Sequence, residues 1–486
     1  MDICVVGSGM GGSILVEELA KTSGFNITVV DCDSIESSFD NSKSLDTNKD
    51  KQLSEEITVG YGFGGTTNLW HGVLTSLDSE DWKEIDKVCN SDVYNDWVNS
   101  SSKLGNYFNG FDINNLHQIR DTKNIKTFLN LDGFDIKNYY VQKLPFRSRN
   151  LIKDLIKKNK NVNLLESAVA ISLSSDSSRT CKYLTYSKNE KIQTLIADIF
   201  IISAGALETP RILLQNSKII SPTIPNLGKG LIDHPHAIVG KITLPKKIFY
   251  KSHGGSSSSL LSPYRIGLTI NKELRRNKKL NHSIFLRPHL GNDHDQWRKN
   301  IKALLQEKFS FSLIKRVFFL KDIFSTVIIL LAEKFGFGVY TDQIAVSVQL
   351  EQDIYNGGEV TLSEYIDKFG RQVPLIKRHF SEDHLKDIES IHNIIKKSLV
   401  KGSLYDAYPI NFTDLNSGAH HSGTCRMGRD SLSAVVDANL KYFGYDNVFI
   451  CDASVIPKIG NANLSITIGG FALRLAEYLK NTYKGK

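Results

Sequence analysis

The chain has 486 residues, of which 41% are hydrophobic and 23% charged, and it is too long for one compact core. Its net charge is only +8, and its lysines are scattered among acidic residues. We therefore expect a globular protein of two lobes, without the basic tail or stripe of a nucleic-acid-binding protein.

The six cysteines form no C-x-x-C pair, which predicts a reducing, cytoplasmic compartment without disulfides. No charged and apolar leader precedes the first predicted strand, so we expect no signal peptide. No apolar run is long enough to span a membrane. The most apolar segment, VFFLKDIFSTVIILLA at residues 317–332, fits two structures: a partly buried helix, or a basic amphipathic helix lying on a membrane or a partner.

The first 33 residues predict a strand, a tight turn, a helix and a second strand. Gly7, Gly9 and Gly12 form G-x-G-x-x-G at the turn, and Asp31 ends the second strand. Glycines at these places let the backbone approach a pyrophosphate at the helix N-terminus. Asp31 can accept both ribose hydroxyls and would repel a 2′-phosphate, so the segment indicates an NAD or FAD site.

Further along the chain, residues 33–56 are polar and predict a surface loop or lid. Residues 57–82 hold five glycines between apolar flanks, which suggests backbone pressed against a flat ligand. Helices with loops are expected over 83–145 and a strand over 161–173. Residues 197–216 then repeat the strand, turn and helix of the N-terminus.

From residue 236 to about 400 the pattern changes to alternating segments such as AVSVQLEQ, with amphipathic helices between them. This predicts a second lobe built on an antiparallel sheet. From residue 405 the chain returns to short strands and a final helix, SITIGGFALRLAEYLKNTY. The chain thus leaves a nucleotide-binding lobe and comes back to it, which could bring the region near residue 420 to the cofactor.

Several blocks, in this order, resemble the glucose–methanol–choline (GMC) family of FAD-dependent oxidoreductases. They are GSGMGG, GFGGTTNLWHG, SAGALETPRILLQNS, NLGKGLIDHP, HHSGTCRMG and DASVIPKIGNANLSIT. The resemblance implies an α/β fold, with a Rossmann-type FAD-binding domain and an α+β substrate domain on an antiparallel sheet. The expected FAD-binding domain comprises 1–82, 142–235 and 405–486, and the substrate domain 83–141 and 236–404.

The resemblance also implies roles for particular residues. His420 matches the catalytic histidine of the family and Asn463 its second catalytic position, with Asn461 as the alternative register. Asp452 and Ala453 would lie near the ribityl chain and pyrophosphate. The remaining implied FAD-binding residues are Gly7, Gly9, Gly12, Asp31, Gly64, Gly65, Thr67, Asn68, Val169 (beside the adenine) and Ala204.

Two departures from the family pattern concern the flavin. Trp70 stands where many members have Asn, and Leu69 stands where covalent members carry the histidine that bonds the flavin. We therefore expect noncovalent FAD, although His71 lies close in sequence.

These residues suit the oxidation of a primary or secondary alcohol. A neutral imidazole with a pKa near its usual value can take the hydroxyl proton, so His420 is the candidate base. Asn463 can donate to the same oxygen while a hydride passes to flavin N5. His421 is expected to support its loop by hydrogen bonding, and His234 and His236 to be structural or at most to line the flavin site.

The frequency of Tyr, Asn, Arg and His between 340 and 420 mildly favours a sugar or polyol substrate. The electron acceptor stays open among oxygen, a quinone, a haem subunit and a carrier. A flavin-dependent lyase of the same fold and a non-catalytic flavoprotein are the alternatives. No metal-ligand spacing is seen, and Cys425 lacks a motif for nucleophilic catalysis.

Overall fold

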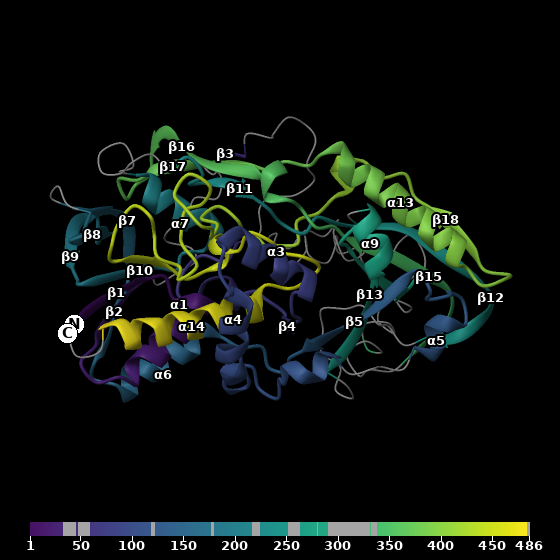
Figure 1. The fold of residues 1–486 in the computed structure, drawn as a ribbon, viewed down its shortest axis with the longest axis horizontal. Coiled ribbons are helices and arrows are strands. Elements are labelled where there is room, and N and C mark those ends of the chain that lie inside the picture. The colour runs from purple at the N-terminus through teal and green to yellow at the C-terminus, as the bar shows by residue number, and fades with distance from the viewer. Residues whose placement is uncertain are drawn as a thin grey trace, which may run out of the picture.

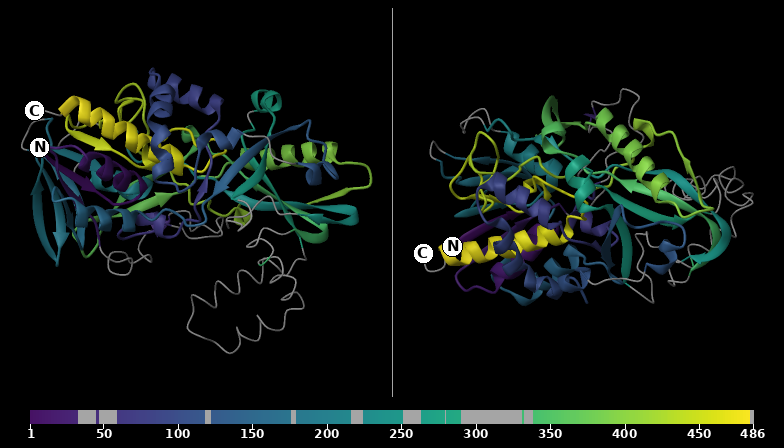
Figure 2. Two further views of the ribbon diagram at one scale, coloured as in Figure 1. Left: turned by 90° about the horizontal axis from the view of Figure 1, so that it is seen from below. Right: turned by 45° about the vertical axis from the view of Figure 1, so that its right-hand side comes forward.

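A computed structural model of the chain describes residues 1–32, 45–46, 59–117, 122–175, 179–215, 224–250, 263–278, 280–289, 331 and 338–483. The molecule is elongated, with a mainly parallel sheet at one end and a large antiparallel sheet at the other (Figure 1). Both termini lie together at the parallel-sheet end in all three views (Figures 1 and 2). Apart from 45–46 and 331, the predicted loop 33–56 and apolar segment 317–332 lie outside the described residues.

The parallel sheet has the strand order β19-β10-β1-β2-β6. Its strands are β1 (Asp2–Val6), β2 (Asn26–Val30), β6 (Val162–Leu165), β10 (Ile199–Ile202) and β19 (Val448–Ile450). They read as short apolar runs because the central strands are buried on both faces. The helices α1 (Met10–Ala20), α6 (Ser148–Lys158) and α14 (Ser465–Tyr483) pack together beside the sheet (Figure 1).

The strand, turn and helix predicted twice from sequence are confirmed. The first is β1 followed by α1. The second is β10 followed by α7 (Gly205–Leu214), and β1 and β10 are parallel neighbours, with Val6 beside Ile202. Two loops of the same design therefore open at the same edge of the sheet.

The predicted antiparallel lobe is also confirmed, with strand order β18-β12-β15-β14-β13-β5-β4. Its strands are β4 (Val73–Leu74), β5 (Phe134–Val141), β12 (His236–Tyr250), β13 (Tyr264–Ile270), β14 (Ser283–Pro288), β15 (Val339–Gln349) and β18 (Leu404–Ala407). Helix α13 (Glu382–Ser398) packs its isoleucines into the apolar core of this lobe. Helices α5 (Lys123–Lys126) and α9 (Lys272–Lys278) also belong to this end (Figure 1).

One expectation from the sequence was wrong here. Residues 83–145 were predicted to be helices and loops, but they include the eight-residue strand β5. The strand was missed because Lys137 and Asn138, both buried, interrupt its apolar pattern.

Two smaller sheets complete the described strands. One contains β7 (Ala168–Ser174), β8 (Tyr183–Lys188) and β9 (Lys191–Ile196), and the other contains β3 (Leu45–Asp46), β11 (Lys229–Leu231), β16 (Gly358–Ile366) and β17 (Gln372–Lys377). The single strand predicted over 161–173 is therefore two strands, β6 and β7.

Helices α3 (Ser79–Cys89) and α4 (Val93–Ser101) lie between the two ends of the molecule (Figure 1). Ile85, Trp97 and Phe108 are buried in the same apolar cluster as the strands of the parallel sheet. This stretch, which our predicted boundaries place in the substrate domain, therefore shares its core with the parallel-sheet lobe. The division into two domains remains a proposal.

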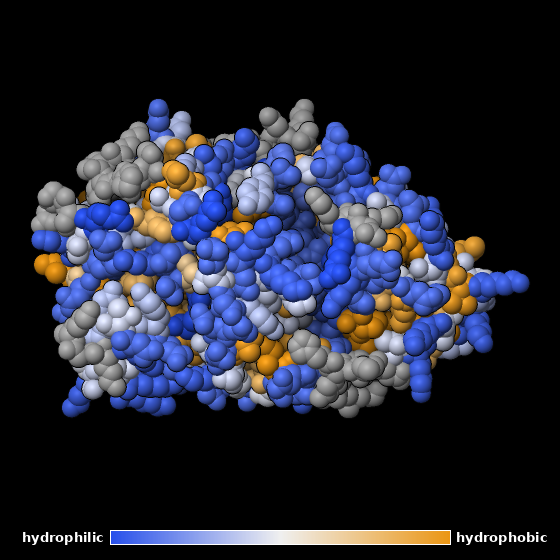
Figure 3. Space-filling view, viewed as in Figure 1, coloured by the Kyte–Doolittle hydropathy of each residue, from blue (hydrophilic) through white to orange (hydrophobic). Residues whose placement is uncertain are grey.

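Figure 3 shows that the face around α3 and α9 is mostly hydrophilic, with small separate hydrophobic patches. Within the described ranges, no helix has the length and apolar character needed to cross a bilayer. All six cysteines are described, and each is a free thiol.

The packing of α14 against α4 gives a first prediction, for Gly470→Ala. A Cβ at Gly470 would lie 2.1 Å from Nε1 of Trp97, a fully buried ring that donates a 3.2 Å hydrogen bond to the carbonyl of Thr467. Alanine gains about 1 kcal/mol in helix propensity, but forcing a fully buried indole aside costs about 2–3 kcal/mol, the upper part of the range for overpacking. We expect a net loss of about 1–2 kcal/mol in the free energy of unfolding, measured by urea denaturation.

The matched control for this change is Glu477→Ala, an exposed position on the same helix. It should change the free energy of unfolding by less than about 0.5 kcal/mol. Equal stability of the two variants would contradict the close contact.

Candidate active site

The glycine turn after β1 has the shape that its sequence predicts. Gly7 has φ +92°, and a Cβ there would lie 2.4 Å from the carbonyl oxygen of Ser203. A Cβ at Gly12 would lie 2.3 Å from the carbonyl oxygen of Gly7. At Gly9, by contrast, the nearest atom would be 3.9 Å away. The turn is closed toward the protein at Gly7 and Gly12 and leaves room at Gly9.

Asp31 is tied to this turn and to the second glycine loop through Ser8. Its carboxylate accepts hydrogen bonds from the backbone N–H of Ser8 at 2.6 Å, from the Ser8 hydroxyl, and from the N–H of Cys32 at 2.7 Å. The Ser8 hydroxyl oxygen accepts from the N–H of Gly64 at 2.8 Å. Burial raises the pKa of Asp31, which these hydrogen bonds oppose. Three segments predicted to bind one cofactor thus meet at one serine.

The second glycine loop continues into a short 3-10 helix, η2 (Gly65–Asn68). Inside the loop, the Thr67 hydroxyl donates to the carbonyl of Gly64 at 2.6 Å, and the side-chain amide of Asn68 donates to the carbonyl of Phe63 at 2.9 Å. Both predicted side chains therefore hold the loop in shape and leave ligand contacts to its backbone.

The side chains that follow this loop point in different directions. Trp70 donates from Nε1 to the carbonyl of Phe146 at 2.8 Å, and its indole packs against the apolar core of the parallel-sheet lobe. Leu69, at the position of the covalent histidine, is 49% exposed, and His71 is also exposed.

The ends of β10 and β19 form the other half of the same edge. Asp452 follows β19, and its carboxylate accepts from the N–H of Gly205 at 2.9 Å and from the Thr209 hydroxyl at 2.5 Å. Thr209 in turn accepts from the N–H of Ala204 at 3.1 Å. Ala453 opens the short 3-10 helix η7 (Ala453–Val455). Burial raises the pKa of Asp452.

Val169, expected beside the adenine, is a buried residue of β7 that pairs with Ser187 of β8. The start of β7 lies next to Asp31, because the N–H of Ala168 donates to the carbonyl of Asp31 at 3.1 Å.

These residues fit an adenine dinucleotide. The room at Gly9 lies at the N-terminus of α1, which has no side-chain cap, so its backbone N–H groups suit a pyrophosphate. Asp31 stands at the neighbouring strand end, where ribose hydroxyls would add donors to a buried carboxylate.

The loop that carries His420 is held by one buried carboxylate, Asp233. Its Oδ1 accepts from the N–H groups of His234 and His420, both at 2.7 Å. Its Oδ2 accepts from the Ser417 hydroxyl at 2.5 Å and the N–H of Gly418 at 3.1 Å. Burial by itself raises the pKa of Asp233, but nearby histidines and these hydrogen bonds lower it overall. Asp233 is therefore ionised, and its two oxygens hold the loop of His420 against the segment of His234.

The structure brings His420 and Asn463 together. The side-chain amide nitrogen of Asn463 lies 2.9 Å from Nε2 of His420. Asn461, the alternative register, points away and its amide donates to Asp78 at 3.1 Å.

A row of hydrogen bonds determines which nitrogen of His420 carries its proton. Nε2 of His234 lies 2.8 Å from the carbonyl oxygen of Gly460, and a carbonyl can only accept, so His234 is protonated at Nε2. In the neutral ring Nδ1 is then an acceptor, and it faces Nδ1 of His420 at 3.1 Å. His420 must donate from Nδ1, which leaves its Nε2 as the unprotonated nitrogen toward Asn463.

Burial supports the neutral state of both rings. It lowers the pKa of His234 from 6.5 to about 3, with a further contribution from His420. It lowers the pKa of His420 from 6.5 to about 4, against the opposing effect of Asp233. Both imidazoles are therefore neutral near pH 7.

Three neighbours of His420 were not identified from sequence as part of its surroundings. His234 was expected to be structural or at most to line the flavin site, and it contacts His420 directly; Asp233 precedes it in the DHP block. The side-chain amide of Gln349, the last residue of β15, lies 3.3 Å from Nδ1 of His420, and it accepts from this nitrogen when the amide is turned with its oxygen toward the ring. His421 is buried, with Nε2 3.9 Å from Asp233, too far for a hydrogen bond.

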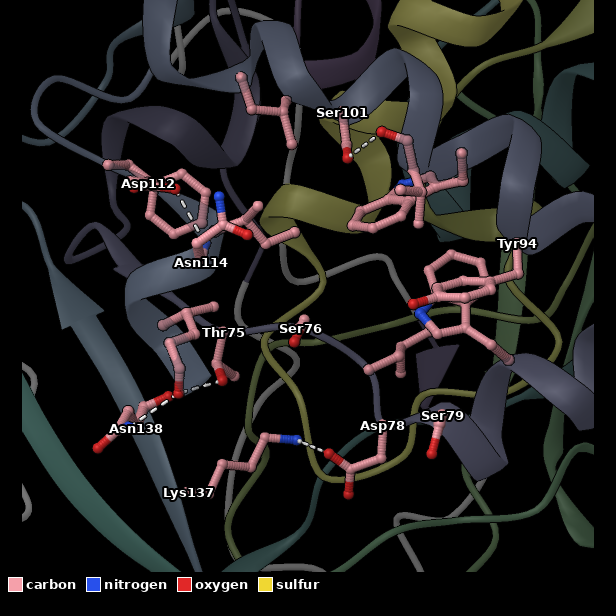
Figure 4. A pocket seen from close by; sticks show the side chains of 18 of the residues that line it. Thr75, Ser76, Asp78, Ser79, Tyr94, Ser101, Asp112, Asn114, Lys137 and Asn138 are labelled. Carbon is pink, nitrogen blue, oxygen red and sulfur yellow. Dashed lines mark hydrogen bonds and ion pairs between the residues drawn. The ribbon is translucent and has the colours of Figure 1, made fainter. Parts of the chain in front are cut away.

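A cavity of about 1000 Å³ lies apart from this pair, between α3, α4 and β5 (Figure 4). Lys137 and Asp78 form an ion pair of 3.1 Å on its wall, and both also bind the side chain of Asn461. Across the described ranges, no group of His, Cys, Asp and Glu is arranged to hold a metal ion.

Comparison with known proteins points to one family. The family model described as GMC oxidoreductase matches residues 356–472. Pyridoxine 4-oxidase of Microbacterium luteolum is 41% identical over 68 residues, which is 14% of this chain and 13% of that enzyme. A putative truncated GMC-type inactive oxidoreductase of Acanthamoeba polyphaga mimivirus is 36% identical over 63 residues, 13% of this chain and 72% of that protein.

The fold agrees over a much longer span. The crystal structure of pyridoxine 4-oxidase from Mesorbium loti superposes with a TM-score of 0.61 and 12% sequence identity, covering 99% of each chain. The sequence matches are short, but the family model and the mimivirus relative, of which this chain covers 72%, both belong to the GMC oxidoreductases. This chain is a member of the GMC oxidoreductase family.

Proposed function

We propose that this protein binds FAD noncovalently and uses it to oxidise a primary or secondary alcohol, with His420 as the base. The observation that carries the proposal is the contact of 2.9 Å between Asn463 and an unprotonated Nε2 of His420. The closed turn at Gly7 and Gly12, and Asp31 beside it, support the cofactor.

The residues that would hold FAD lie along one edge of the parallel sheet. Gly9 and the start of α1 would bind the pyrophosphate, and Asp31 would bind the ribose. The loop around Gly64 and Gly65 would pack against the isoalloxazine ring. Bound FAD would supply the acceptor for a hydride from the substrate carbon.

His420 would take the hydroxyl proton of the alcohol at Nε2. A low pKa keeps this nitrogen free of protons at neutral pH. Without a substrate, the nitrogen is occupied by the amide of Asn463.

Asn463 would then change partners when the alcohol binds. The substrate oxygen enters between the two side chains, donating its proton to His420 and accepting from the amide of Asn463. The amide hydrogen bond gains strength as negative charge develops on that oxygen.

The substrate class is an alcohol, and its partner is an electron acceptor. Within that class, a sugar or polyol is the finer proposal, supported by the polar residues between 340 and 420 and by Gln349 beside His420. The Microbacterium relative is named for the oxidation of pyridoxine, so pyridoxine belongs in any panel of test substrates.

The first prediction here concerns how the flavin is held. Because Leu69 replaces the bonding histidine, precipitation with acid should leave the yellow colour in the supernatant. The measurement is flavin absorbance in both fractions. Colour that stays with the pellet would show a covalent link, and a protein that is purified colourless and takes up no FAD would contradict the cofactor itself.

A second prediction concerns the reaction. Under anaerobic conditions, at least one alcohol in a panel of sugars, polyols, choline and pyridoxine should bleach the flavin absorbance of the wild-type protein. His420→Asn should slow that bleaching by about 10²–10⁴-fold, because a general base contributes that much. Glu477→Ala is the matched control.

Three results would count against this proposal. Product formation without bleaching of the flavin would indicate the lyase. Neither bleaching nor product formation would indicate the non-catalytic flavoprotein. Equal bleaching rates in His420→Asn and Glu477→Ala would indicate a different base.

The third prediction is the pH dependence of that bleaching. An imidazole at its ordinary pKa of 6.5 would lose half its activity near that pH. Since burial lowers the pKa of His420 to about 4, the rate should stay level as pH falls from 8 to about 5 and decline only below that, as Nε2 takes up a proton. Stopped-flow rates at saturating substrate test this, and a midpoint near pH 6.5 would contradict the burial of His420.

A further inference from the structure

Glu351 is a buried carboxylate that the proposed reaction does not use. It follows the end of β15, two residues after Gln349, and its side chain is only 8% exposed. Its Oε1 accepts from the backbone N–H of Gly460 at 2.8 Å and pairs with Nζ of Lys458 at 3.0 Å. A carboxylate placed this deep needs these partners to offset its loss of hydration.

Gly460 is the residue whose carbonyl accepts from His234. It has φ +56°, and a Cβ there would lie 2.3 Å from Oδ2 of Asp81. Asp81 therefore packs against one side of Gly460, and Glu351 accepts from its N–H. The carbonyl of Gly460 accepts from Nε2 of His234.

The contacts form one unbroken row. Glu351 holds the N–H of Gly460, the carbonyl of Gly460 accepts from His234, and His234 accepts from Nδ1 of His420. A carbonyl displaced from His234 would release the proton on its Nε2, and both rings could then exchange tautomers. Nε2 of His420 would carry a proton for part of the time and could not act as an acceptor.

We propose that Glu351 is a positioning residue: by fixing Gly460 it sets the tautomer of His234 and thereby keeps Nε2 of His420 unprotonated. The inference rests on the proposed function for its meaning in catalysis, but the tautomer itself is a property of the protein alone. Glu351 touches neither His420 nor Asn463, so its effect passes through the main chain.

The surroundings of Glu351 give the row a pH dependence. Burial raises its pKa to about 7, with Asp81 adding to the rise and Lys458 opposing it. Lys458 also pairs with Glu84 at 3.2 Å, and Nδ1 of His282 accepts from the N–H of Glu351 at 3.0 Å. The ionised carboxylate is the stronger acceptor, so the hydrogen bond to Gly460 strengthens as pH rises through about 7. The neutral carboxyl still offers an acceptor oxygen, so the tautomer, and with it the level rate between pH 8 and about 5, does not change.

The variants that test this are Glu351→Ala, which removes the acceptor for Gly460, and Glu351→Gln, which keeps an acceptor oxygen without a charge. Glu84→Gln is the control, because it removes the other carboxylate on Lys458 at a position 62% exposed. The readout is the 15N chemical shifts of labelled histidine in the FAD-loaded protein, with His420 assigned by its absence from His420→Asn.

We expect wild type, Glu84→Gln and Glu351→Gln to show His420 protonated at Nδ1 alone, and Glu351→Ala to show a mixture of tautomers. Wild type should also show a change in the Nδ1 shift of His420 near pH 7 that Glu351→Gln lacks. Anaerobic flavin reduction should slow in Glu351→Ala by up to about 10²-fold in kcat with little change in KM, the size of effect seen when a catalytic group is misplaced.

An unchanged tautomer in Glu351→Ala overturns the inference, and so does an equal pH response in wild type and Glu351→Gln. If the alanine variant does not fold, the comparison with Glu351→Gln decides alone. If no alcohol reduces the flavin of any variant, the proposed function fails while the histidine shifts still decide the role of Glu351.

Discussion

The hydrogen bond from His234 to the carbonyl of Gly460 is the constraint on which the site depends. A carbonyl cannot donate, and a buried neutral imidazole has a single N–H, so one main-chain oxygen orients every proton along the row to Asn463. The same bond explains why burial of both rings is useful. If either imidazole gained a second proton, both of its nitrogens would donate and the donor and acceptor roles along the row would no longer be fixed. Burial lowers the pKa of both rings and so opposes that second proton.

The parts of the site come from segments far apart in the chain, and the sheets bring them together. Parallel strands place their carboxyl ends at one edge, so the turn after β1, Asp31 after β2 and Asp452 after β19 become neighbours. Gln349, at the end of β15 in the antiparallel sheet, lies beside His420. The surroundings of His420 therefore include a side chain from the antiparallel lobe.

Much of the fold could be predicted because the signals are local. A glycine turn between an apolar strand and a helix carries its own geometry, and Gly7 and Gly12 have the close contacts that only glycine permits. Alternating segments likewise predicted the antiparallel sheet. Strand β5 was missed because Lys137 and Asn138 are buried polar residues whose partners lie elsewhere in the chain.

The surroundings of the catalytic candidates were harder to predict for a related reason. His234 and His420 are separated by 186 residues, and nothing in the DHP block shows that its imidazole faces another. Asn461 and Asn463 are chemically identical two residues apart, and their partners distinguish them. Asn461 binds the ion pair of Lys137 and Asp78, whereas Asn463 lies beside His420. Long-range pairing, which sequence patterns do not record, decides both cases.

The strand β19 and helix α14 have a consequence for how the protein is made. Both come from the last forty residues, yet β19 adds to the sheet beside β10, and α14 packs on α1 and α4. During translation, the first glycine turn leaves the ribosome long before the segments that complete its surroundings. The nascent chain therefore exposes the apolar surface of α1 that α14 covers until α14 itself has been synthesised.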